Sequence, residues 1–121
     1  MQSRSHRFPK TSRLGGRNSF AAIRTGGLKF SRGPLNVWAL PNSLDHGRLG
    51  ISIGRHVGIA VRRNRIKRLL REAYRLMQHD LPASYDWLVV VKRHEPMMLG
   101  EYQKLLSAAT VHLHNAWLER K

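Results

Sequence analysis

Residues Arg62 to Arg75 read RRNRIKRLLREAYR, and in this segment and its flanks apolar residues recur three and four positions apart. That spacing is typical of a helix with one buried face, so we predict a helix from about Gly58 to about Gln78. Its apolar stripe consists of Ile66, Leu69, Leu70, Ala73 and Met77. Because this stripe must be covered by other elements, the helix is expected to belong to a folded domain.

The opposite face of the predicted helix is almost wholly cationic, since Glu72 is the only acid in the segment. At about 100° per residue, the arc opposite Ile66 holds Asn64, Arg65, Lys67, Arg68, Arg71 and Arg75, with Arg63 at its edge. Like charges at this spacing repel by roughly 0.2–0.5 kcal/mol per pair, a cost that a bound polyanion removes. The alternative is that this face is simply exposed to solvent, but such faces normally carry both positive and negative side chains. The excess of Arg over Lys favours phosphate binding, because guanidinium groups match phosphate oxygens.

The whole chain has the same charge bias. Its 121 residues include 22 Lys and Arg against 7 Asp and Glu, a formal charge of +15 that makes nucleic acid the leading partner class. The length fits one domain. We expect a basic, disordered N-terminal arm over residues 1–7 and a single domain over residues 8–121 that binds nucleic acid, which the family resemblance given below narrows to RNA.

Membrane insertion and export are not expected. The longest apolar run, Trp87 to Val91, is far shorter than the roughly 20 residues that span a bilayer. The basic N-terminus lacks the apolar stretch of a signal peptide, and the chain has no cysteine for disulfides or thiolate metal sites. We therefore expect a cytoplasmic protein.

Three strands and two more helices complete the pattern read from the residues. Leu35–Leu40 and Arg48–Ile53 alternate between apolar and polar positions, and the turn-forming residues between them favour an antiparallel hairpin. The apolar run from Asp86 or Trp87 to Val91 suggests a central strand buried on both faces. A short helix is predicted from Asn18 to Arg24, capped by Asn18 or Ser19, and a long one from about Gly100 to Leu118. The apolar stripe of the long helix consists of Tyr102, Leu105, Leu106, Ala109 and Leu113.

No catalytic or metal-binding constellation is predicted. The few acids are scattered, and His112 and His114 lie two positions apart on a predicted helix, so they point to different sides and cannot clasp one metal ion.

The run Ala60 to Glu72 resembles the Arg-Asn-Arg signature helix of the bacterial ribonuclease P protein family. Outside this run the resemblance rests on Arg13-Leu14 followed by Phe20 and Ile23, on Leu49-Gly50-Ile51-Ser52, and on Asp86 before the apolar strand. It covers about Phe8 to Leu118. The resemblance implies an α+β fold, a two-layer α/β sandwich with a small, mostly antiparallel sheet in the order α-β-β-β-α-β-α. It also implies a left-handed β-α-β crossover, as in the second domain of ribosomal protein S5, although most such crossovers are right-handed.

The resemblance further implies a protein subunit of an endonuclease that matures the 5′ end of tRNA, with catalytic groups on an RNA subunit and Mg²⁺ bound mainly by RNA and substrate. The expected partners are ribonuclease P RNA and precursor tRNA, with no membrane and no protein partner required. The residues expected to bind the RNA subunit are Arg62, Arg63, Asn64, Arg65, Lys67, Arg68 and Arg71. Those expected to line a cleft for the 5′ leader are Arg13, Phe20, Ile23, Trp38 and Arg93.

Some assignments stay open on the residues alone. Phe20 and Ile23 could simply pack in the core, whereas Trp38 lies on the strand face opposite Leu35 and Val37 and is better placed to be partly exposed. Gly54-Arg55-His56 stands where the family has a Ser-Lys-Lys-like segment, so Arg55 and His56 are less secure candidates for RNA contact. A ribosomal or other structural RNA-binding protein is the main alternative function. A DNA-binding module is a weaker one, because an almost wholly cationic face is poorly suited to reading base edges.

Overall fold

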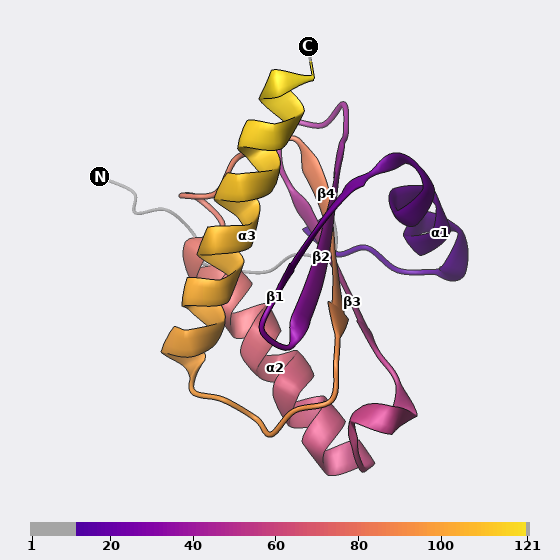
Figure 1. The fold of residues 1–121 in the computed structure, drawn as a ribbon, viewed down its shortest axis with the longest axis vertical. Helices are drawn as coiled ribbons and strands as arrows, with labels where there is room; N and C mark the ends of the chain where they lie inside the picture. Colours follow the sequence, from indigo (N-terminus) through magenta and orange to yellow (C-terminus); the bar gives the residue numbers. More distant parts are fainter. Residues whose placement is uncertain (1–11, 121) are drawn as a thin grey trace.

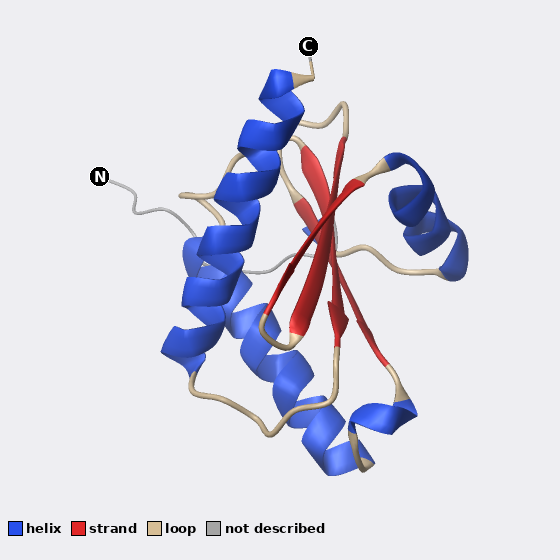
Figure 2. Cartoon of the chain, in the orientation of Figure 1, coloured by secondary structure: helices blue, strands red, loops and turns tan. Residues whose placement is uncertain are grey.

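The computed structural model describes residues 12–120, so the predicted arm over residues 1–7 lies outside it. These residues form three α-helices and one four-stranded sheet. Figures 1 and 2 show that the helices lie on both sides of the sheet. In chain order the elements are α1 (Arg17–Gly26), β1 (Leu28–Arg32), β2 (Leu35–Pro41), β3 (Arg48–Ile53), the 3₁₀ turn η2 (Arg55–Val57), α2 (Ala60–Met77), β4 (Tyr85–Val91) and α3 (Leu99–Glu119). This is the α-β-β-β-α-β-α order that the family resemblance implies.

The sheet has the strand order β1-β2-β4-β3. β1 with β2 and β2 with β4 are antiparallel, while β3 and β4 are parallel and are joined through α2. β4 lies between two strands, as its apolar run predicts, and five of its seven residues from Tyr85 onward are buried in succession. The left-handed sense of the β3-α2-β4 crossover stays a prediction from the resemblance.

The predicted hairpin between Leu35–Leu40 and Arg48–Ile53 is wrong, because β4 is inserted between these two strands. The turn-forming residues instead carry the chain across the end of β4, where the Asn42 side-chain amide donates to Asp86 Oδ1 at 2.8 Å. The actual hairpin joins β1 to β2 through Gly33, whose φ of 55° suits glycine. β1 was missed on the residues alone because Lys29, Ser31 and Arg32 mask its two apolar positions.

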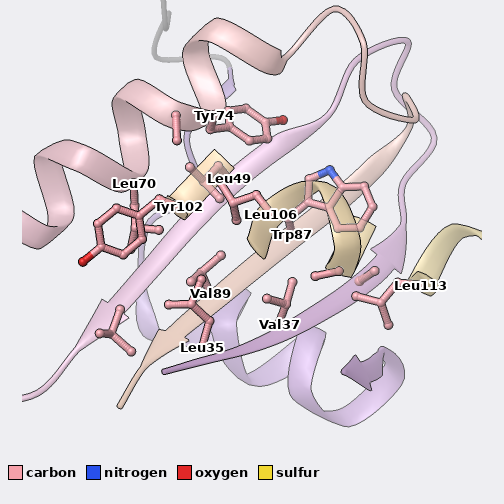
Figure 3. Packing of buried hydrophobic residues seen from close by; sticks show 14 of the residues in the cluster. Leu35, Val37, Leu49, Leu70, Tyr74, Trp87, Val89, Tyr102, Leu106 and Leu113 are labelled. Atoms are coloured by element: carbon pink, nitrogen blue, oxygen red, sulfur yellow. The ribbon is translucent and has the colours of Figure 1, made fainter. Parts of the chain in front are cut away.

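The main core lies between the sheet and the layer formed by α2 and α3. Figure 3 shows Leu70, Tyr102 and Leu106 of the helices against Trp87 and Val89 of the central strand. The predicted stripes face this core, since all their members are either buried or packed against it. Each fully buried side chain of this size contributes about 1.5–3 kcal/mol, so this layer fixes the direction in which the basic face of α2 points.

α1 covers part of the opposite sheet face (Figure 1). Ile23 is 1% exposed, and a Cβ on Gly50 would lie 2.5 Å from Phe20 Cε1, so α1 docks where β3 has no side chain. The predicted caps Asn18 and Ser19 are wrong: Gly16 is the N-cap, with no side-chain cap. The reason is that the helix begins earlier than its first apolar residue suggests.

The segment before α1 extends the sheet at its β3 edge. Arg13 forms a parallel bridge with Leu49, and the Leu14 N–H donates to the Leu49 carbonyl at 2.8 Å. This contact brings a basic segment from the N-terminal side of the chain to the same side of the sheet as α2.

Candidate nucleic-acid interface

The solvent-facing side of α2 forms a cationic groove of about 380 Å³. Its sole acid, Glu72, is bound by Arg75 through two contacts, Nη2 to Oε2 at 2.6 Å and Nε to Oε1 at 3.0 Å. This pairing lowers the pKa of Glu72 and keeps the carboxylate charged. The residues that line the groove are Arg13, Asn64, Lys67, Arg68, Arg71, Glu72 and Arg75. The charges of Glu72 and Arg75 offset each other, so the net positive charge of the groove comes from the other four cationic residues. Such a groove is suited to binding a phosphate backbone.

The first turn of α2 holds two of the predicted arginines in place. The Arg63 Nε donates to the Gly58 carbonyl at 3.0 Å, and Arg62 Nη2 lies 3.3 Å from Glu95 Oε2. Arg62 is thus partly neutralised by a loop carboxylate, whereas Arg65 and Asn64 are exposed. The signature residues therefore differ in how freely they could meet a phosphate.

Arg55 and His56 lie on η2, immediately before α2, and both are exposed. The parallel register pairs Ile53, the last residue of β3, with Val91, the last residue of β4. Arg93 follows two residues later and is also exposed. The three side chains thus belong to the same end of the sheet, the end away from α1.

Trp38 lies on the other sheet face, beside α1, and is half-buried as its strand position predicts. Two cations converge on its ring: Lys29 Nζ lies 5.1 Å and Arg24 Cζ 5.8 Å from the ring centroid. Lys29 is its direct cross-strand partner on β1, and Arg24 is in the last turn of α1. Within residues 12–120, neither cation forms an ion pair with a carboxylate, so this aromatic surface carries uncompensated positive charge.

The predicted cleft residues do not all gather around Trp38. Phe20 is half-buried against Gly50, and Ile23 is fully buried, which favours the core-packing alternative for Ile23. Arg13 lines the α2 groove rather than the Trp38 side. Sequence reasoning missed Arg24 and Lys29. The alternation of β1 could have revealed Lys29, because it places this residue on the face of Trp38.

The described part of the chain contains no group of three or more His, Cys, Asp or Glu residues that could hold a metal ion. The buried Asp86 binds Arg48 in a bidentate pair, at 2.8 Å to Nε and 2.7 Å to Nη2, which raises the pKa of Arg48. His112 stacks on Phe30 and His114 contacts the Tyr85 hydroxyl, so the two histidines face different neighbours. Among the described residues, no helix is long and apolar enough to cross a membrane.

Comparisons with known proteins agree on one family. The family model described as Ribonuclease P matches residues 8–116. The ribonuclease P protein component of Desulfovibrio desulfuricans is 38% identical over 104 residues, which cover 84% of this chain and 80% of the relative. That of Dictyoglomus turgidum is 37% identical over 98 residues, covering 81% and 82%.

Solved structures of the family share the fold. The Staphylococcus aureus RNase P protein superposes with a TM-score of 0.74 at 28% identity, covering 83% of this chain and 93% of that one. The Thermotoga maritima RNase P protein gives 0.73 at 30% identity, covering 81% and 94%. The chain therefore belongs to the ribonuclease P protein family, the protein component of an endoribonuclease that processes tRNA.

Proposed function

We propose that the α2 groove binds the catalytic RNA subunit of ribonuclease P. The observation that carries this proposal is the placement of Arg13, Lys67, Arg68 and Arg71 around one groove whose sole acid is already paired. Guanidinium and ammonium groups held in this way contact successive backbone phosphates and release counterions. Arg62, Arg63, Asn64, Arg65, Arg55 and His56 extend the contact along the start of α2.

The Trp38 surface binds the single-stranded 5′ leader of precursor tRNA. A half-exposed indole stacks on a base without demanding a particular sequence, for about 1–3 kcal/mol per base. Lys29 and Arg24 supply charge for the phosphates on either side of that base. Phe20, which packs against Gly50 of β3, and Arg93, which follows the end of β4, extend the proposed leader contact.

The catalytic groups belong to the RNA subunit, and Mg²⁺ is held mainly by the RNA and the substrate. The protein raises affinity for precursor tRNA and positions its leader, acting in the cytoplasm and without a further protein partner. Support comes from the charge distribution, since both proposed surfaces are cationic and neither presents a carboxylate cluster within the described residues.

The test is cleavage of a precursor tRNA by a bacterial ribonuclease P RNA at low Mg²⁺ and moderate salt, with and without the protein. The expected result is that the protein restores cleavage at the mature 5′ end. If the protein binds RNA but stimulates cleavage with no compatible RNA subunit, the alternative of a structural RNA-binding protein would replace this proposal.

A further inference from the structure

A second hollow, of about 360 Å³, lies beside the β1–β2 turn on the sheet face away from Trp38. Side chains alternate along β1, so Lys29 and Ser31 share the face of Trp38, whereas Arg32 pairs with Leu35 and faces the α2 and α3 layer. The residues that line the hollow are Arg32, Gly33, Pro34, Met97, Glu101, Lys104 and Leu105. It is therefore distinct from both the α2 groove and the Trp38 surface.

The walls of this hollow are held by a chain of hydrogen bonds. The Lys92 N–H donates to the Pro34 carbonyl at 2.7 Å, which ties the loop after β4 to the hairpin turn. His94 Nδ1 lies 2.9 Å from the Lys92 carbonyl, which can only accept, so Nδ1 carries a proton. In neutral His94 the Nε2 then accepts from the Tyr102 hydroxyl at 2.8 Å, and that hydroxyl accepts from the Met97 N–H at 3.2 Å. The hollow is thus largely formed before any ligand arrives.

The chemistry of the hollow suits a flat aromatic group that carries negative charge. Pro34, Met97 and Leu105 supply apolar walls, and a methionine thioether makes favourable contacts with aromatic rings. Arg32 and Lys104 are exposed, and neither forms an ion pair with a carboxylate among residues 12–120. The volume lies within the range of small-molecule sites, roughly 300–1,000 Å³.

The one acid that lines the hollow is already engaged. The Glu101 carboxylate accepts from the Met98 N–H at 3.3 Å, at the start of α3. Negative charge at a helix N-terminus is favourable, so Glu101 serves the helix, while Arg32 and Lys104 remain available for a phosphate.

The hollow lies close enough to Trp38 for one single-stranded nucleic acid to reach both. Trp38 and Pro34 are four positions apart along the chain, about 13 Å at 3.3 Å per residue. Between them, on the Trp38 face, Ser31 Oγ donates to Asn36 Oδ1 at 2.6 Å. The β1–β2 hairpin closes in a tight turn at Gly33. A single-stranded nucleic acid that follows β2 from Trp38 toward Pro34 would cross this turn and reach the hollow.

We infer that this hollow binds one unpaired nucleotide of the precursor tRNA leader, further from the cleavage site than the nucleotide at Trp38. The base lies on Pro34, Met97 and Leu105, and its phosphate lies between Arg32 and Lys104. This inference rests on the proposed leader-binding function and extends it to a second, separate nucleotide site.

The experiment uses the reconstituted holoenzyme and a series of precursor tRNAs whose leaders are shortened one nucleotide at a time, with mature tRNA as the leaderless member. Dissociation constants are measured for the wild type, for Lys104→Met, for Arg32→Met and for the double variant. Arg120→Met is the matched control, since it removes an exposed cation from the far end of the same helix. Circular dichroism and thermal unfolding verify that each variant folds.

The wild type should gain affinity in two steps as the leader lengthens. The double variant should retain the first step and lose most of the second, a loss of about tenfold for long leaders because two charge-assisted phosphate contacts are removed, while Arg120→Met keeps both steps. An equal effect on short and long leaders, or none on long leaders, overturns the hollow as a nucleotide site. If the wild type itself binds leader-bearing and mature tRNA equally, the proposed leader-binding function fails as well, which separates the two failures.

Discussion

The α2 groove and the Trp38 surface are both cationic, yet they are built in opposite ways. Most of the groove comes from one helix, within which Asn64, Arg68 and Arg71 follow one another at helical spacing. The Trp38 surface comes from three elements, because Arg24 is on α1, Lys29 on β1 and Trp38 on β2. A site within one helix depends on local structure, whereas a site between elements depends on correct docking.

The largest expected effect is a loss of affinity for ribonuclease P RNA when charge is removed from the α2 groove but not from the Trp38 surface. Replacing Arg68 and Arg71 by Ala should weaken binding to ribonuclease P RNA by about 10- to 100-fold, because two charge-assisted contacts are lost. The slope of log affinity against log salt should fall by about 1.5. Filter binding over a salt series measures both quantities.

The control for this prediction is the double variant Lys92→Ala and Arg120→Ala, which removes the same charge from exposed positions outside the groove. An equal loss of affinity in this control would mean that only the net charge matters. The groove would then have no special role.

The next effect concerns the aromatic surface. Trp38→Leu should weaken holoenzyme binding of leader-bearing precursor by about tenfold, through loss of base stacking, and leave mature tRNA unchanged. Parallel titrations of the two RNAs measure the difference. The same loss for both RNAs would show that Trp38 acts through the fold rather than through the leader.

A smaller effect is expected for the cation beside that ring. Lys29→Met should reduce the salt slope of the leader-dependent affinity by about 0.7, the value of one single-strand phosphate contact. Arg32→Met, measured with a short leader, is the control. Arg32 is on the same strand but faces the other side of the sheet, so its loss should leave the salt slope for a short leader unchanged. If the salt slope of Lys29→Met equals that of the wild type, Lys29 packs on the Trp38 ring without contacting a leader phosphate.

The smallest effect concerns the acid inside the groove. Arg75 lowers the pKa of Glu72 in the folded state, so the ion pair adds stability above the unfolded pKa, near 4.5, and this contribution is lost as pH falls through the folded pKa. Because both side chains are solvent-accessible, the contribution is small. Urea unfolding at pH 7 and pH 3 should show a difference between wild type and Glu72→Gln that shrinks at the lower pH. A difference that grows on acidification would contradict the direction of this shift.

The sequence predicted the parts of the fold that depend on local periodicity. α2 and α3 lie within two residues of their expected bounds, and the apolar run up to Val91 is the central strand. The failures concern contacts between distant segments. Turn formers after Leu40 show that the chain turns but not which strand it joins, so β2 and β3 were paired wrongly. For the same reason Arg24 and Lys29 were missed beside Trp38, and the sequence did not indicate that Arg13 lines the α2 groove.

The short bridge between Arg13 and Leu49 also affects how the free protein behaves in solution. β3 is an edge strand, and an uncovered edge offers N–H and carbonyl groups that can pair with another chain. Here the Leu14 N–H already binds the Leu49 carbonyl, and the opposite edge, β1, carries Lys29 and Arg32. Charged side chains and covered edges both oppose edge-to-edge aggregation. The cations proposed to bind RNA therefore also protect the sheet from self-association before any RNA is bound.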